Sequence, residues 1–185
     1  GLPKKFDLRM WLLSDGKSQK VDRELGLARA RAATLLLLAL PGCTYMYQGE
    51  ELGLFEVEDL KQEDLQDPTW FRNVHRIMRK EKPSGLALIH TEKGRDGCRV
   101  PIPWTLNGEG AHGFSTRHSL TTDEAWLPQP KGWGEFAVDK QVQNQNSTLW
   151  LYRKAMKIRQ SEAGLGDGEM EWIKAGKKVI AFSRP

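Results

Sequence analysis

The chain has 185 residues, a length that suits one domain with a real core, and 39% of them are hydrophobic and 28% charged, which argues against disorder. No secretory leader pattern is visible, and the most apolar run, residues 32–40, is far shorter than the about 20 residues of a membrane span. We therefore expect a cytoplasmic protein with no membrane partner.

The formal net charge of +4 and the pI near 9.1 raise the question of nucleic-acid binding. Residues 72–93 contain six basic and two acidic side chains, so this one stretch carries the whole excess. A local basic face of this kind is more often solvated than bound to nucleic acid, and no nucleic-acid-binding motif accompanies it. We expect no nucleic-acid partner.

A helix is predicted from about Asp22 to Leu40, with acidic residues in its first turn and Pro41-Gly42 at its end. One side of its first half consists of apolar side chains, those of Leu25, Ala28, Ala32 and Leu35. Residues 43–48 follow as a short buried strand rich in β-forming residues. A long helix joined to a strand by a tight turn indicates an α/β fold with a parallel sheet.

Residues 52–145 show no long helical period and read as a long loop with small elements of its own. We expect short helices at 56–66 and 70–82, and a strand or hairpin arm in 83–93. A second long helix is predicted from Ser147 to about residue 163, with Asn146-Ser147 as its N-cap pair. Its apolar face comprises Leu151, Tyr152, Ala155, Met156 and Ile158. Residues 170–182 then predict two strands of a hairpin around Ala175-Gly176.

Two glutamates, Glu50 and Glu51, follow the predicted strand, where functional groups of parallel sheets collect. Glycoside hydrolysis needs two carboxyl groups on opposing sides of one bond. If the strand continues to residue 51, neighbouring side chains point to opposite faces. The pair is then no catalytic dyad, and at most one glutamate points into a site.

The segment GRDGCRVPIPW, residues 94–104, offers a second polar group. Arg95 beside Asp96 suits a fork in which a guanidinium pairs with a carboxylate and still donates to sugar hydroxyls. The alternative is that Asp96, Arg95 and Arg99 only staple a long loop. The same alternative of ligand stacking or loop packing applies to four tryptophans, Trp70, Trp104, Trp126 and Trp133.

Neither a metal nor a cofactor is expected. The four histidines lack metal-ligand spacing, and no glycine-rich phosphate loop or Ser-His-Asp motif is present. The two cysteines, Cys43 and Cys98, form no disulfide framework, and free buried thiols in a reducing compartment are favoured over a pair.

The motifs LARARAATLLLLALPG, TYMYQGEELGL, LQDPTW, GRDGCRVPIPW, AWLPQP and STLWLYRKAMKIR, in this order, resemble the C-terminal part of an α-glucosidase of the α-amylase superfamily. The likeness is greatest to the branch of oligo-1,6-glucosidases and bacterial α-glucosidases. It implies a partial (β/α)8 barrel: its seventh helix, its eighth strand at 44–48, a long eighth loop at 52–145 and its eighth helix. Residues 1–164 are then the C-terminal part of the catalytic barrel, and residues 165–185 the first hairpin of a truncated β-sandwich domain.

The resemblance further implies retaining hydrolysis of terminal α-linked glucose in maltose-type or isomaltose-type oligosaccharides. The family's aspartate nucleophile, glutamate acid/base and second aspartate lie on earlier barrel strands, so we expect no catalytic residue in this chain. It would be an inactive fragment whose partner is the missing N-terminal barrel portion of the same protein. Val100 and Ile102 depart from the commonest residues of the motif, and the basic stretch appears as an insertion.

Two residues match family positions that line the glucose pocket, Glu51 of QGEE and Arg95 of RD. Supporting positions are matched by Gln48, Gly49, Asp96, Arg99 and Trp104. The competing hypothesis is a non-catalytic carbohydrate-binding or interaction module that uses Arg95, Trp104, Trp126 and the basic stretch.

Overall fold

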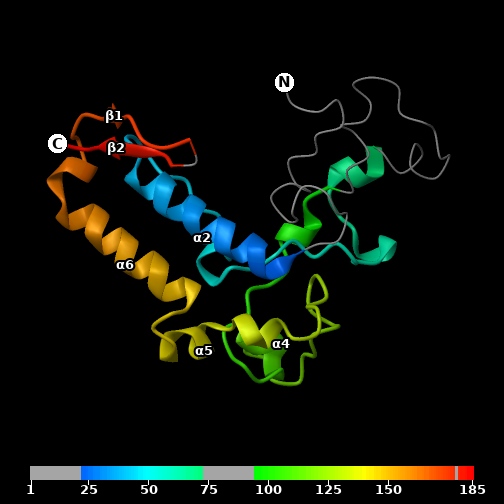
Figure 1. Cartoon of the computed structure of the whole chain (residues 1–185). Coiled ribbons are helices and arrows are strands. Elements are labelled where there is room, and N and C mark those ends of the chain that lie inside the picture. Colours follow the sequence, from blue (N-terminus) through cyan, green and yellow to red (C-terminus); the bar gives the residue numbers. More distant parts are fainter. Residues whose placement is uncertain (1–21, 73–93, 178) are drawn as a thin grey trace. The chain divides into compact units, whose positions relative to one another are not determined.

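The computed structural model describes residues 22–72, 94–177 and 179–185. The chain divides into two compact units (Figure 1). The helical unit comprises the described residues up to Gly53 and from Asn144 onward, and the loop unit runs from Leu54 to Gln143. The basic stretch and the strand or hairpin arm predicted in 83–93 lie outside the described residues, apart from Arg72.

The predicted first long helix is confirmed as α2, Arg23–Ala39. Asp22 is its N-cap, and the Asp22 carboxylate accepts a hydrogen bond of 2.9 Å from the Leu25 amide. Such a cap satisfies one of the amide groups that the first turn leaves without a helical partner. The backbone leaves the helix at Leu40, directly before Pro41-Gly42.

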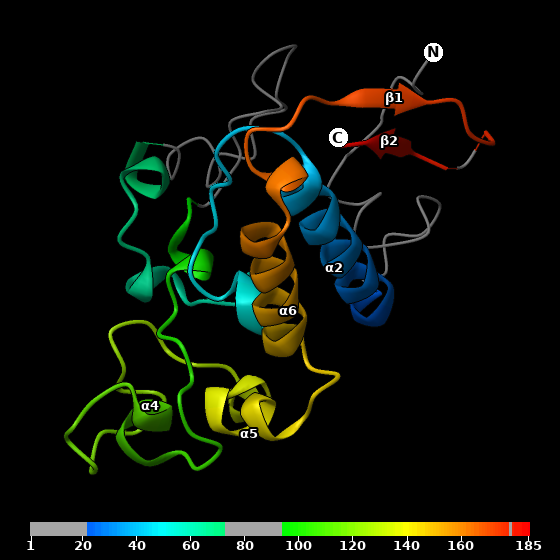
Figure 2. The same cartoon turned by 90° about the vertical axis from the view of Figure 1, so that its left-hand side faces the viewer.

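The second long helix is α6, Thr148–Ser161, and Ser147 is its N-cap as predicted, with its hydroxyl accepting from the Trp150 amide. Helices α2 and α6 pack side by side (Figures 1 and 2). Within this contact the Thr34 and Tyr152 hydroxyls lie 2.8 Å apart and are hydrogen-bonded. Burial raises the pKa of Tyr152 above its ordinary value, and the nearby charges of Glu50 and Glu51 also raise it.

The predicted apolar face of the first helix is wrong in part. Ala28, Ala32 and Leu35 are exposed, while Thr34 and Leu38 are the buried residues of α2. The helix is apolar around most of its second half, so periodicity alone does not identify the side that meets a partner. On α6 the same limit applies: Tyr152 is buried as predicted, whereas Ile158 is 53% exposed.

Two arginines from outside α2 hold its carboxyl end. Arg159 of α6 donates to the carbonyl oxygens of Leu38, Leu40 and Gly42. Arg184 donates to the carbonyl oxygen of Ala39 at 2.9 Å, and also to three carbonyls in residues 166–169. The last carbonyls of a helix lack intrahelical donors and carry partial negative charge, and α2 has no basic residue in its own last turn. Distant arginines therefore supply the C-terminal cap.

Residues 43–48 form no strand in the described part of the chain, contrary to the prediction: residues 43–47 have no regular secondary structure, and residue 48 lies in a turn. Their side chains are mostly exposed as well, with Tyr45 at 93% and Tyr47 at 50%. A strand is defined by ladder hydrogen bonds to a neighbour, and no neighbouring strand lies beside this segment among the described residues. The predicted parallel sheet is thus not formed within the described residues.

The predicted C-terminal hairpin is confirmed. Strand β1, Glu171–Ile173, pairs antiparallel with β2, Ala181–Ser183, and Trp172 lies opposite Phe182. Their rings meet edge to face with centroids 5.8 Å apart, a favourable cross-strand pair. The hairpin belongs to the same compact unit as α2 and α6. The assignment of residues 165–185 to a separate domain stays a prediction.

The loop unit has little regular structure, and its core consists of side chains that loops bring together. These are Val57, Leu60, Leu65, Trp70, Val100, Leu127 and Trp133, with Leu54 and Phe55 packed against them. The expected helix at 56–66 is reduced to one 3₁₀ turn, η2, Gln62–Asp64. Residues 68–72 are helical, which confirms the described part of the helix predicted at 70–82. The remaining short helices are η4 Asp96–Cys98, α4 Glu109–Gly113, η5 Trp133–Phe136 and α5 Val138–Gln143, and in the helical unit η1 Glu50–Leu52 and η6 Ala163–Leu165.

Candidate functional site

Asp96 is the buried centre of a polar cluster in the loop unit, with 1% of its surface exposed. One carboxylate oxygen, Oδ2, accepts from the backbone amides of Gln66 at 2.9 Å and Asp67 at 2.8 Å. The other, Oδ1, has no hydrogen-bond partner in the described residues and lies 3.6 Å from Nη1 of Arg99. A buried carboxylate needs such donors and a counter-charge, because desolvation of an unpaired charge is costly.

Asp67 completes the cluster from the other chain segment. Its Oδ2 accepts from the Arg99 guanidinium and from the Arg95 amide, each at 3.1 Å, and its Oδ1 accepts from the Thr69 amide at 2.8 Å. The Thr69 amide is the main cause that lowers the pKa of Asp67 from 3.8 to about 2, with Arg95 and Arg99 adding to it against the opposing effect of burial. We call Asp67, Asp96 and Arg99 the carboxylate clamp.

The clamp draws the segments QDPTW and GRDGCR together. The Val57 amide also donates to the Gly97 carbonyl at 3.1 Å. A Cβ atom on residue 97 would lie 2.3 Å from the carbonyl oxygen of Val57, so this close approach requires glycine. Asp96 and Arg99 therefore staple this loop, and their support of a pocket stays a prediction.

Arg95 behaves differently from Asp96 and Arg99. Its backbone amide is bound by Asp67, yet the residue is exposed, and its guanidinium makes no hydrogen bond or ion pair with other described residues. The predicted Arg95–Asp96 fork is thus wrong, because Asp96 is turned inward to Gln66 and Asp67. What remains is a fixed backbone that presents a guanidinium to solvent.

Glu51 lies in the helical unit, in η1. Its Oε2 accepts from the Gly49 amide at 2.8 Å. Gly49 is buried and has φ 92°, a left-handed conformation that suits glycine and starts the 3₁₀ turn. Gln48 is exposed in the turn before it. The QGEE segment therefore fixes the Glu51 carboxylate on its own backbone.

The strand argument about Glu50 and Glu51 does not apply to this geometry. Both residues lie in η1, with 3.0 residues per turn, so their side chains diverge by about a third of a turn and not by the half turn of a strand. Glu51 and Arg95 belong to different units, so a common site for them stays a prediction.

The four tryptophans named from the sequence divide into two pairs. Trp70 and Trp133 are buried, at 5% and 2% exposure, and belong to the core, as the packing alternative predicts. Trp104 and Trp126 are exposed, at 50% and 57%. Trp104 is fixed by its backbone, which accepts from the Asp139 amide and donates to the His112 carbonyl.

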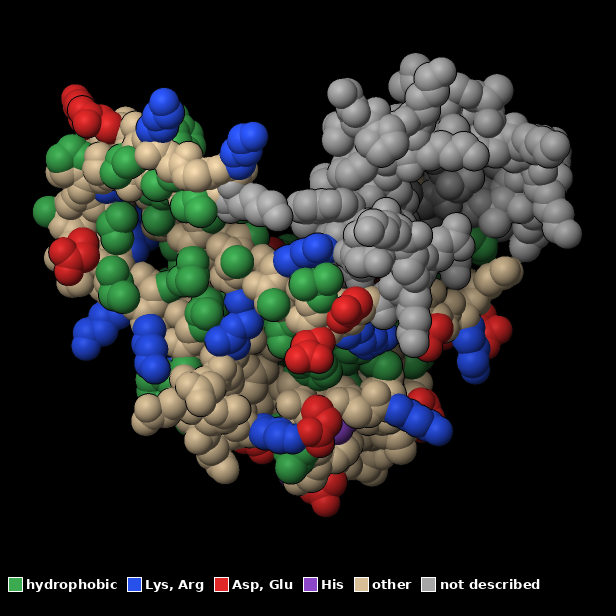
Figure 3. All heavy atoms as spheres, viewed as in Figure 1, with side chains coloured by type: hydrophobic (Ala, Val, Ile, Leu, Met, Phe, Trp, Pro, Cys, Tyr) green, Lys and Arg blue, Asp and Glu red, His purple; other side chains and the backbone are tan. Residues whose placement is uncertain are grey.

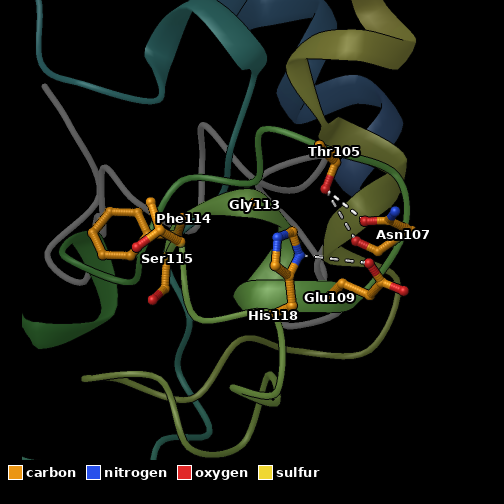
Figure 4. Close-up of a pocket in the computed structure, with 8 residues that line it drawn as sticks. Thr105, Asn107, Glu109, Gly113, Phe114, Ser115 and His118 are labelled. Atoms are coloured by element: carbon orange, nitrogen blue, oxygen red, sulfur yellow. Dashed lines mark hydrogen bonds and ion pairs between the residues drawn. The ribbon is translucent and has the colours of Figure 1, made fainter.

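A left-handed turn follows Trp104, at residues 110–113. Four successive residues have positive φ: Gly110 59°, Ala111 53°, His112 56° and Gly113 74°. For Ala111 and His112 this conformation is costly, by about 1–2 kcal/mol per residue. Residues 108–118 curl around an open pocket of about 320 Å³ (Figure 4). Sequence reasoning missed this turn, since only the loop conformation reveals it.

Asp67 was missed as well, and the only sequence signal for it is its place in the DPTW motif. Cys43 and Cys98 are both free thiols, but both are exposed, so the expectation of burial is wrong. In the described ranges no group of three or more His, Cys, Asp and Glu residues is placed to hold a metal ion. No helix in these ranges is long and apolar enough to cross a membrane.

The family description alpha amylase, catalytic domain, matches residues 16–168. A probable alpha-glucosidase of Rhizobium meliloti (strain 1021) is 34% identical over 157 residues, which cover 85% of this chain and 24% of that protein. An oligo-1,6-glucosidase of Heyndrickxia coagulans is 31% identical over 149 residues, covering 78% of this chain and 25% of that protein.

Among solved structures, the crystal structure of an alpha-glucosyl transfer enzyme superposes with a TM-score of 0.61 at 33% identity, covering 84% of this chain and 25% of that one. The chain thus spans about a quarter of the length of these relatives. The structural relatives are (β/α)8-barrel enzymes of the α-amylase family, matched over part of their length. These findings confirm the resemblance seen in the motifs.

Proposed function

Because this chain belongs to the α-amylase family, we propose that it forms part of a retaining α-glucosidase that removes terminal α-linked glucose from oligosaccharides. Its contribution is one wall of the glucose pocket, with Glu51 and Arg95 in contact with sugar hydroxyls. Gln48, Gly49, Asp96, Arg99 and Trp104 support these two side chains.

The Arg95 loop is the observation that carries this proposal. The carboxylate clamp and the Arg95 amide fix the loop backbone, whereas the Arg95 guanidinium stays exposed and without a bond in the described residues. A guanidinium is a rigid donor of several hydrogen bonds and suits sugar hydroxyls held in a fixed geometry. A purely structural arginine would be expected to use its donors within the protein, as Arg99 does.

The barrel assignment belongs to this proposal. Helix α2 would be the seventh barrel helix, residues 44–48 the eighth strand, and α6 the eighth helix. The hairpin would open a β-sandwich domain at residue 165. In support, residues 44–48 have no strand partner in the described residues, and their two tyrosines are exposed. Hydrophobic side chains also lie at the surface over α2, α6 and the hairpin (Figure 3). Such unpaired apolar surfaces suit elements that are packed against neighbours in a larger barrel.

The acid, the nucleophile and the transition-state aspartate would come from the N-terminal barrel portion of the same protein, and the substrates would be of the maltose or isomaltose type. The experiment compares the 185-residue chain with a longer form that has the length of the relatives, using a chromogenic α-glucoside. We expect turnover only by the longer form, with the α-anomer of glucose released first. Clear hydrolysis by the 185-residue chain would contradict the assignment of catalysis to other residues.

A non-catalytic carbohydrate-binding module is the second candidate, favoured by the exposed faces of Trp104 and Trp126. Calorimetry with maltose and isomaltose on the longer form distinguishes the candidates. Saturable binding without any hydrolysis would support the module. For the α-glucosidase we also expect the exposed apolar surface of the 185-residue chain to bind hydrophobic dye; a monomer that binds no dye would count against it.

A further inference from the structure

We propose that the pocket beside the left-handed turn is a second binding site, for one ring of a neutral sugar. We call it the turn pocket. It lies wholly within the loop unit and measures about 320 Å³. Its lining residues are Thr105, Asn107, Glu109, Gly113, Phe114, Ser115, Thr116 and His118. The site goes beyond the glucose pocket proposed above, because neither Glu51 nor Arg95 lines it.

Hydrogen bonds from the left-handed turn hold the backbone of the turn pocket in place. His112 is buried, and its Nδ1 lies 3.0 Å from the Thr105 carbonyl and 2.8 Å from the Asn107 carbonyl. Both oxygens can only accept, so Nδ1 carries a proton and donates. One side of the pocket is thereby tied to the left-handed turn.

The opposite side is tied to the same turn. The Gly110 amide donates to the His118 carbonyl at 3.1 Å, and the Ser115 amide donates to the Gly110 carbonyl at 2.9 Å. Buried Gln129 also donates to the Ala111 carbonyl at 3.0 Å. These bonds offset the strain of Ala111 and His112, and strain kept in this way often marks a functional site. The pocket is thus pre-organised, which lowers the entropic cost of binding.

The chemistry of the lining suits a sugar ring. Figure 4 shows the polar groups of Thr105, Asn107 and Glu109 on one side, with Phe114 and Ser115 on the other and the His118 imidazole between them. Phe114 is 53% exposed, so its ring can pack against the C–H face of a sugar. Carboxylate, amide and hydroxyl groups opposite an aromatic ring can bind the hydroxyls around the edge of that sugar.

Charge narrows the ligand class. Among the described residues no lysine or arginine lines the pocket, and the Glu109 carboxylate lies 3.7 Å from Nδ1 of His118. These described lining residues therefore offer a phosphate group no cationic side chain and place a carboxylate in the lining, which disfavours a phosphorylated sugar. A volume of about 320 Å³ lies at the small end of ligand pockets, which suits one ring and not a long chain.

The test is maltose binding to the full 185-residue chain, measured by saturation-transfer NMR and calorimetry. We expect Phe114→Ala to weaken binding at this site about fivefold to tenfold and Phe114→Tyr to leave it within about twofold, because a stacked ring contributes of the order of a tenfold change. Glu109→Gln should weaken binding about threefold. Phe71→Ala, at a phenylalanine outside the lining with a similar exposure of 59%, is the matched control and should have no effect.

Arg95→Ala separates this proposal from the proposed function. Loss of binding in Arg95→Ala with none in Phe114→Ala or Glu109→Gln would overturn the turn pocket and leave the glucose pocket standing. Weaker binding in Phe114→Ala and Glu109→Gln with unchanged binding in Arg95→Ala would support the turn pocket alone. Tighter binding of a phosphorylated disaccharide than of maltose, or no maltose binding at all, would overturn it too. Circular dichroism checks that each variant is folded. If Phe114→Ala does not fold, Glu109→Gln serves as the test variant.

Discussion

The carboxyl end of α2 in the helical unit and the Asp96 loop in the loop unit share one physical problem, unpaired backbone polar groups, and solve it in opposite directions. In the helical unit, side chains with positive charge come to carbonyl oxygens: Arg159 and Arg184 cap the end of α2. In the loop unit, carboxylates come to amide groups: Asp67 and Asp96 accept from the loop backbone. The carboxyl end of a helix leaves carbonyl oxygens without donors. An irregular loop can instead leave several amide groups without acceptors, and one carboxylate can accept hydrogen bonds from two of them.

The largest effect is expected from Asp96→Ala, which removes the centre of the carboxylate clamp. Two amides lose their acceptor, and Arg99 loses one of its two carboxylate neighbours. Removal of one member of a buried charged network costs about 3 kcal/mol of unfolding free energy. Urea titration followed by tryptophan fluorescence measures it, since four of the seven tryptophans, Trp70, Trp104, Trp126 and Trp133, lie in the loop unit.

Asp59→Ala is the control for that measurement. Asp59 is exposed in the same unit, so its substitution should change the urea midpoint little. An unchanged midpoint in Asp96→Ala would mean that the clamp does not hold the loops.

Arg159→Ala should lower the unfolding free energy by about 2 kcal/mol, the next largest effect. It removes charge-assisted hydrogen bonds to the carbonyls at the end of α2 and a favourable interaction with the helix dipole. Far-UV circular dichroism during urea titration follows the two long helices. Lys157→Ala, at an exposed cation on the same helix, is the matched control; equal losses in both variants would show that charge alone matters.

Lowering the pH should reduce the stability of the loop unit, because Asp67 becomes protonated. Its pKa is lowered from 3.8 to about 2 in the folded chain. The folded form therefore binds its proton less readily than the unfolded form, and the stability that Asp67 contributes is present above pH 4 and is lost as pH falls from about 4 to about 2. The Asp67→Asn variant should lack this part of the pH dependence. A parallel loss in wild type and variant would assign the acid effect to other carboxylates.

The smallest effect on stability is expected from Arg95→Ala, less than about 0.5 kcal/mol, because the exposed guanidinium makes no bond in the described residues and the Asp67 contact uses the backbone amide. Thermal unfolding measures this change, with Arg99→Ala as the destabilised comparison. If both arginines proved equally important for stability, Arg95 would be a structural residue and the proposed pocket wall would lose its main support.

Local chemistry in the sequence determined the boundaries of the regular elements. Ser147 is a helix N-cap in both the prediction and the structure, α2 begins next to Asp22 as expected, and the chain leaves α2 directly before Pro41-Gly42 as expected. These features depend on a few neighbouring residues, so they can be read without knowing the fold. The ordered motifs QGEELG and GRDGCR also sufficed to identify the family.

Only the tertiary structure decided which polar groups of the backbone and side chains find hydrogen-bond partners. Residues 43–48 have the composition of a strand but no strand beside them in the described part of the chain, and Asp96 turns away from its neighbour Arg95 toward Gln66 and Asp67. A helix carries its hydrogen bonds within one segment, whereas a strand, a buried carboxylate and an arginine cap take their partners from residues far along the chain. Such partners are set by packing, which the local sequence does not encode.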